Sequence, residues 1–138
     1  MAKYTVYCDG SYSSQHKQSG SGVVIMKDND MVLCFNRSFK GGTNNRGELF
    51  ALILAMKSFT KPVDEIEFVS DSLYCINTIN GAYKIRKNIK LWKLFFHYYD
   101  KLKQLCNNIT FTWVKGHSVC EGNIYADELA NNASTNNG

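Results

Sequence analysis

The sequence has 138 residues, of which 44% are hydrophobic and 20% are charged, and its net charge is +4. This length and composition are typical of one soluble globular domain with its own core, and no apolar run is long enough to cross a membrane. No signal peptide precedes the first expected strand, and five cysteines without a Cys-x-x-Cys pair indicate reduced thiols, a cytoplasmic location and no zinc site.

The first half of the chain predicts three strands followed by a helix. Residues 3–10 alternate in a way that favours a central strand ending at the carboxylate of Asp9. A polar loop is expected over residues 11–21, followed by strands at residues 23–27 and 31–39 that a tight turn connects. A helix capped by Thr43 or Asn44 is expected to run to about residue 59.

The second half predicts two further strands and three helices. Residues 65–70 predict a short strand that ends before Asp71, and residues 109–114 predict the last strand, with Trp113 in the core. Helices are expected over residues 72–79 and 89–105, and from residue 121 or 123 to residue 132, with residues 133–138 frayed. No linker or internal repeat divides the chain, so one domain over residues 1–138 is expected.

This order of elements predicts an α/β fold built on a five-stranded mixed sheet flanked by helices. Short connections join the first three strands, which are expected to be antiparallel. The last two strands follow helical crossovers and are expected to run parallel to the first. Ligands of such sheets bind beyond the carboxyl ends of the parallel strands, and Asp9 and Asp71 are both expected at that edge.

Four acidic residues occupy comparable positions on different elements: Asp9 and Asp71 at strand ends, and Glu48 and Asp127 early in helices. Taken singly, each has an ordinary structural explanation as a turn, cap or helix-dipole residue. Gathered in one cleft, they would repel each other unless cations neutralised them, and their hard oxygen atoms suit Mg²⁺ or Mn²⁺. Two such ions can bind the attacking and leaving oxygens of a phosphodiester displacement.

Positive charge is concentrated in residues 84–103, which contain seven basic residues and one acid. The rest of the chain has nine basic and eleven acidic residues. This asymmetry suggests a face for a polyanion, although a solvated helix face explains the same pattern.

Four segments, spread over most of the chain, carry a family resemblance. They are Y-C-D-G-S at residues 7–11, T-N-N-R-G-E-L at 43–49, V-S-D-S-L-Y at 69–74, and W-V-K-G-H-S at 113–118 followed by N-I-Y-A-D-E-L-A at 123–130. In this order they resemble ribonuclease H of the type 1 branch. The resemblance implies the ribonuclease H fold and Mg²⁺-dependent endonucleolytic cleavage of the RNA strand of RNA–DNA hybrids, leaving 5′-phosphate and 3′-hydroxyl ends.

The resemblance also implies roles for individual residues in catalysis. Two Mg²⁺ ions are implied, with Mn²⁺ able to substitute, and His117 matches a loop histidine that assists proton transfer or product release. The residues that match the family's metal-binding tetrad are Asp9, Glu48, Asp71 and Asp127.

Substrate contacts follow from the same resemblance. Asn44 and Asn45 match residues that bind the minor groove, where the 2′-hydroxyl distinguishes RNA from DNA. Thr43 and Asn88 match residues that bind a phosphate of the DNA strand. Helix capping is the simpler explanation for Thr43, Asn44 and Asn45, and one of them is expected to do both.

The sequence departs from the family at several positions, most clearly in the loop after Asp9. Many members have a G-N-P-G-rich loop after D-G-S, whereas residues 11–20 here read S-Y-S-S-Q-H-K-Q-S-G. Two alternatives therefore stand beside the nuclease: a non-catalytic module that binds hybrids or double-stranded RNA on the same fold, and another nuclease or resolvase of the superfamily. A monomer is expected, and a start at Met1 with an end soon after the last helix favours a free-standing enzyme.

Overall fold

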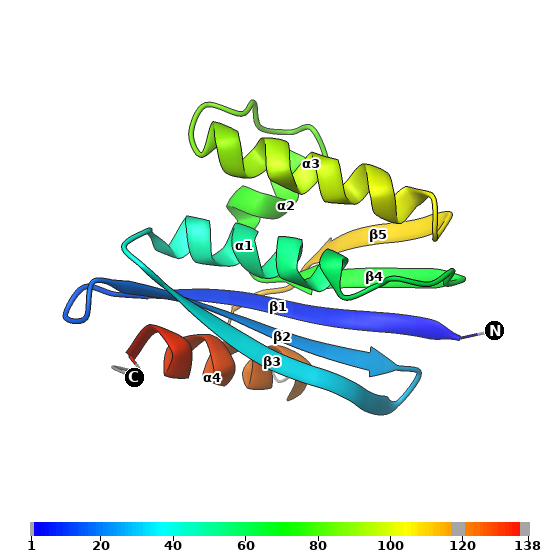
Figure 1. Cartoon of the computed structure of the whole chain (residues 1–138), viewed down its shortest axis with the longest axis horizontal. Helices are drawn as coiled ribbons and strands as arrows, with labels where there is room; N and C mark the ends of the chain where they lie inside the picture. The colour runs from blue at the N-terminus through cyan, green and yellow to red at the C-terminus, as the bar shows by residue number, and fades with distance from the viewer. Residues whose placement is uncertain (1, 117–120, 136–138) are drawn as a thin grey trace.

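A mixed sheet of five strands forms the centre of the molecule in this computed structural model, which describes residues 2–116 and 121–135 (Figure 1). The strand order is β3-β2-β1-β4-β5. No helix in the described part of the chain is long and apolar enough to span a membrane. The elements are β1 (Lys3–Ser13), β2 (Gln18–Lys27), β3 (Asp30–Lys40), α1 (Asn44–Lys57), β4 (Glu65–Ser70), α2 (Leu73–Ile79), α3 (Ile89–Lys103), β5 (Asn108–Trp113) and α4 (Glu121–Thr135).

The strand directions are those predicted from the sequence. β2 pairs with β1 and β3 in antiparallel fashion, whereas β4 is parallel to both β1 and β5. Figure 1 shows α1, α2 and α3 on one face of the sheet and α4 on the other. The α/β class and the five-stranded mixed sheet are thereby confirmed.

The main core lies between the sheet and the helices α1 and α3. The predicted apolar stripe of α1 is buried, including Leu49 and Leu52 at 0% exposure, and it packs with Val6 of β1 and Phe68 of β4. Aromatic rings of α3 complete this layer; the rings of Phe95 and Phe111, for example, have centroids 5.8 Å apart. This packing fixes β1, β4 and α1 relative to one another, which matters for the site described below.

The second face of the sheet is covered by α4, which lies directly against the backbone of β2. A Cβ atom at Gly20 or Gly22 would collide with the main-chain carbonyls of Ala130 and Ala126. Only glycine therefore allows the helix and the strand to approach this closely. The contact holds α4 in a defined position along the sheet.

Three expectations about element boundaries and packing are wrong. Residues 11–21 are not a loop, because β1 and β2 continue as a hairpin in which Ser11 pairs with Gly20. Asp9 consequently lies within β1 rather than at its end. Of the predicted frayed end, residues 133–135 are helical, since Ser134 is 1% exposed and shares a hydrogen bond of 3.0 Å with the Ser11 hydroxyl, whereas residues 136–138 lie outside the described residues. The third is Trp113, which is 41% exposed instead of lying in the core.

Candidate active site

Asp9 lies at the centre of the sheet, where it is 2% exposed. Its neighbour Gly10 is the point at which α1 touches β1. A Cβ atom on Gly10 would collide with the backbone nitrogen of Glu48. The lack of a side chain at residue 10 therefore lets the first turns of α1 reach β1 and brings Glu48 beside Asp9.

The start of α1 is held in place by hydrogen bonds. Thr43 is the N-cap, as predicted, and its Oγ1 accepts from the backbone N–H of Arg46 at 3.1 Å. The Ser21 hydroxyl of β2 donates to the carbonyl of Gly47 at 2.8 Å. These contacts fix the helix turn that carries Glu48.

Asp71 follows β4 directly and faces the same space. The Trp113 indole Nε1–H donates to the Asp71 carbonyl at 3.1 Å, and Ser72, not Asp71, caps α2 by accepting from Cys75 N–H at 3.1 Å. Asp9, Glu48 and Asp71 each offer a carboxylate oxygen, and these atoms lie within 4.8 Å of one another.

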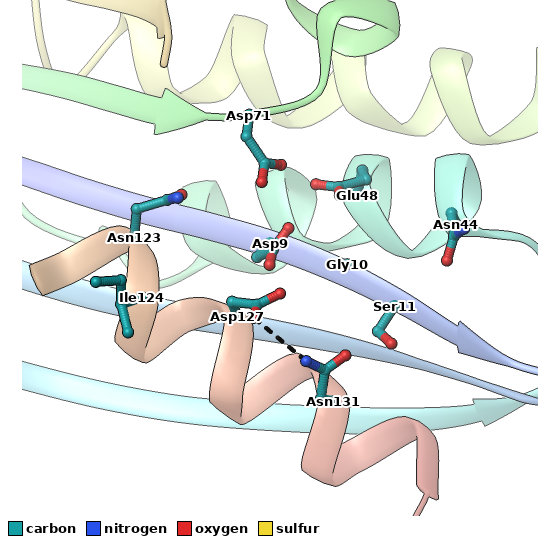
Figure 2. Close-up of a pocket in the computed structure, with 10 residues that line it drawn as sticks. All are labelled: Asp9, Gly10, Ser11, Asn44, Glu48, Asp71, Asn123, Ile124, Asp127 and Asn131. Carbon is teal, nitrogen blue, oxygen red and sulfur yellow. Dashed lines mark hydrogen bonds between the residues drawn. The ribbon is translucent and has the colours of Figure 1, made fainter. Parts of the chain in front are cut away.

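Asp127 approaches from α4, on the opposite side of this cluster. Figure 2 shows its carboxylate facing Asp9, with a hydrogen bond of 3.3 Å from the Asn131 Nδ2 group. All four predicted acids thus line one cleft of about 390 Å³. The complete lining is Asp9, Gly10, Ser11, Asn44, Glu48, Asp71, Asn123, Ile124, Asp127 and Asn131.

Burial and mutual repulsion favour the protonated forms of these acids in the absence of a cation. Burial raises the pKa of Asp9 from its ordinary value of 3.8 to about 8, and the neighbouring Asp127 and Asp71 carboxylates add to the effect. Burial and the charge of Asp9 also raise the pKa of Glu48 well above its ordinary range. Asp9 Oδ2 and Glu48 Oε2 are buried without a hydrogen-bond partner among the residues that the structure describes. Unpaired oxygens of this kind fit a bound divalent cation, which favours their ionised forms.

The residues matched to substrate binding lie around the start of α1. Asn44 lines the cleft, and Asn45 is exposed beside it. Asn88 adopts a left-handed conformation with φ 56° before α3, and its Oδ1 accepts from Arg46 Nη1 at 3.2 Å. Thr43 and Asn88 are therefore both hydrogen-bonded to Arg46, a residue that the sequence reasoning missed.

His117 lies outside the described residues, so its predicted role stays a prediction. The chain just before it reaches the acidic cleft, because a Cβ atom on Gly116 would lie 3.3 Å from Asp71 Oδ2. Asn123 and Asn131 also line the cleft without having been predicted. Each lies four residues from Asp127 on α4, a helical spacing, and Asn123 also opens the N-I-Y-A-D-E-L-A segment that carries the family resemblance.

Comparisons with known proteins agree with this geometry. The RNase H family model matches residues 1–135. The chain is 34% identical to ribonuclease H of Jannaschia sp. (strain CCS1), covering 94% of this chain and 90% of that protein. It is 35% identical to ribonuclease H of Chlorobium phaeobacteroides (strain BS1), and the match covers 98% of this chain and 97% of that protein.

Solved structures lead to the same family. RNase H1 from the halophilic archaeon Halobacterium salinarum superposes with a TM-score of 0.77 at 25% identity, covering 95% of this chain and 96% of that chain. LC11-RNase H1, solved in complex with an RNA/DNA hybrid, superposes with a TM-score of 0.75 at 25% identity. The match covers 94% of this chain and 95% of that chain. With a matching family model, relatives above 30% identity and an acidic cleft on the same fold, the chain belongs to the ribonuclease H family.

Proposed function

We propose that this protein is an endonuclease that hydrolyses the RNA strand of RNA–DNA hybrids, leaving 5′-phosphate and 3′-hydroxyl ends. The observation that carries the proposal is the meeting of four carboxylates from β1, α1, α4 and the end of β4 in one cleft. Family membership and the hybrid-bound structure of LC11-RNase H1 support the substrate. In the reaction, water adds across the bond between phosphorus and the 3′ oxygen, and the 3′ oxygen leaves with a proton.

The metal part of the proposal assigns Asp9, Glu48, Asp71 and Asp127 as ligands of two Mg²⁺ ions, with Mn²⁺ able to substitute. The oxygen-only donor set and the buried unpaired oxygens of Asp9 and Glu48 support this assignment. Bound ions of this type activate water and neutralise charge on the leaving oxygen. The carboxylates would hold such ions in a defined place, because Asp9 is buried in the central strand and Glu48 lies on the helix that packs against it.

Substrate binding is assigned to the region around the start of α1. Thr43 and Asn88, joined through Arg46, would bind a phosphate of the DNA strand, and Arg46 adds a guanidinium to that pair. Asn44 and Asn45 would read the minor groove, where amides can both donate to and accept from the 2′-hydroxyl. The exposed cations Lys84, Arg86 and Lys87 extend this surface, and His117 would assist proton transfer or product release. Taken together, the assigned contacts follow both strands of a hybrid.

The proposal also includes the setting of the enzyme. We infer that a single domain acts as a monomer, because one chain is sufficient to bring all four carboxylates into the cleft. A reducing compartment such as the cytoplasm is inferred from the thiols of Cys8, Cys34, Cys75 and Cys106, which are unbridged in the described residues.

A cleavage assay with labelled substrates tests the function. The protein is incubated with an RNA–DNA hybrid, and with matched RNA and DNA duplexes, in Mg²⁺, Mn²⁺ or chelator. We expect metal-dependent cutting of the RNA in the hybrid alone, and loss of cutting in Asp9→Asn and Asp71→Asn variants that keep their circular dichroism spectra. Turnover retained by either variant would refute the metal assignment. Binding without cutting would favour the non-catalytic module, and cutting of DNA junctions or DNA duplex would favour another nuclease of the superfamily.

A further inference from the structure

Three buried side-chain atoms have no hydrogen-bond partner within residues 2–116 and 121–135, and all three are oxygens. They are Asp9 Oδ2, Glu48 Oε2 and Asn123 Oδ1. All three residues line the same acidic cleft. The first two belong to the proposed metal ligands, whereas nothing above assigns a role to Asn123.

Asn123 is built into the cleft rather than resting at its rim. It is 2% exposed and lies in the first turn of α4, four residues before Asp127. Figure 2 shows its side chain projecting from α4 towards Asp71. The preceding residue, Gly122, lies against β1 so closely that a Cβ atom there would collide with the ring of Tyr7. This contact fixes the helix turn that carries the amide.

Asn123 Oδ1 has no donor among the described residues. The ionisable groups that line the cleft are four carboxylates. A protonated carboxyl could donate to it, but the ionised carboxylates that a bound cation favours can only accept. A buried acceptor without a donor is destabilising. A divalent cation bound in the cleft is a suitable partner for such an oxygen, since amide oxygens are ordinary ligands of these ions.

We propose that Asn123 is a fifth oxygen ligand of the cation site, binding through Oδ1. This inference rests on the proposed metal-dependent function. A neutral ligand adds to the coordination sphere without adding to the repulsion among the four carboxylates. Asn123 therefore helps the site to bind the cation and leaves the charge of the empty site unchanged.

The test measures Mg²⁺ binding to the substrate-free protein by titration calorimetry and by the shift in melting temperature. Asn123→Leu removes the oxygen while keeping the same number of side-chain heavy atoms, and Asn123→Ala removes it with less bulk in case the leucine is not accommodated. Asn123→Asp keeps an oxygen at the same place. Asn132→Leu is the matched control, because Asn132 is exposed on the same helix and does not line the cleft.

We expect Asn123→Leu and Asn123→Ala to raise the dissociation constant for Mg²⁺ by about tenfold or more, whereas Asn132→Leu leaves it unchanged. Asn123→Asp should retain binding close to that of the wild type. The metal-free melting temperature of Asn123→Leu should not fall, because an unpaired acceptor has been removed, yet its gain on adding Mg²⁺ should shrink.

Two results would overturn the role of Asn123 alone. One is unchanged Mg²⁺ affinity in Asn123→Leu and Asn123→Ala. The other is weaker binding in Asn123→Asp than in Asn123→Leu, which would show that the amide donates to the carboxylates instead of binding the cation. A wild-type protein that binds neither Mg²⁺ nor Mn²⁺ would instead overturn the proposed metal site itself.

Discussion

Replacing Asp9 by asparagine should stabilise the metal-free protein at neutral and alkaline pH while abolishing its metal-dependent activity. Burial, with the nearby carboxylates, raises the pKa of Asp9 from 3.8 to about 8 in the folded protein. The folded state therefore binds this proton more tightly than the unfolded state does. Stability is fully present below about pH 4 and falls as the pH rises towards 8, since folding takes up a proton throughout that range.

The size of the effect follows from the pKa values. Each pKa unit corresponds to 1.36 kcal/mol, so a shift from 3.8 to about 8 lowers the free energy of unfolding by about 6 kcal/mol across the full range. About 4 kcal/mol of this is lost by pH 7, which is a large part of the 5–15 kcal/mol typical of a domain. The amide in the Asp9→Asn variant would be neutral at every pH. The pKa of Glu48 is also raised, so the free energy of unfolding of the variant should still fall somewhat as the pH rises.

The assay is urea denaturation in chelator, followed by far-ultraviolet circular dichroism between pH 4 and pH 9. Wild type and Asp9→Asn should have similar stability at pH 4 and diverge as the pH rises, with the variant more stable. Asp64→Asn, at an exposed acid, should follow the wild type. Adding Mg²⁺ at pH 8 should restore much of the lost stability to the wild type and less to the variant.

Parallel pH profiles for wild type and Asp9→Asn would refute this reasoning, because they would show that Asp9 ionises in the folded protein as readily as in the unfolded one. A variant that is less stable than the wild type at pH 8 in chelator would refute it as well. Either result would also weaken the argument that the cleft requires a cation.

Three further predictions concern the framework of the site and the substrate. Gly10→Ala should lower the free energy of unfolding by several kcal/mol and weaken Mg²⁺ binding, because its Cβ would push the backbone of Glu48 away from β1; urea denaturation and calorimetry would check this, and wild-type values would contradict it. Thr43→Ala should cost about 1 kcal/mol through loss of the cap to Arg46, and Thr43→Ser should restore most of it in the same denaturation assay. The affinity for the hybrid, measured in Ca²⁺, should fall steeply as the salt concentration rises. Lys84→Ala should reduce the slope of log affinity against log salt concentration by about one. An affinity that does not change with salt would exclude phosphate contacts.

Much of the fold could be predicted because its pattern is local. β4 has the predicted bounds, Glu65–Ser70, since a short apolar run between polar residues is a sufficient signal for a buried strand. The hairpin over residues 11–21 could not be predicted in this way. Its Ser and Gly residues resemble a loop, but they are small because α4 lies directly against Gly20 and Gly22. That requirement comes from a helix more than a hundred residues later in the chain.

The same division applies to the candidate site. The four acids could be predicted because each stands at a recognisable position and the family resemblance groups them. Asn123 was not predicted, although it opens a segment that carries the resemblance, because an Asn at a helix start is usually a cap. Its burial in a cleft lined by carboxylates is visible only in the structure. The expectation for Trp113 is wrong because a sequence pattern does not reveal that β5 is an edge strand, where the ring remains exposed while its N–H holds the Asp71 carbonyl.

The placement of α4 on the second face of the sheet has a consequence for synthesis on the ribosome. Asp9, Glu48 and Asp71 all lie within about the first half of the chain, whereas Asn123 and Asp127 emerge with its last helix. The glycine surface of β2 that receives this helix cannot be covered earlier. A nascent chain consequently lacks two of the ligands proposed for the cation site, Asn123 and Asp127, until its last helix is made, and the acidic cleft is complete only when α4 docks.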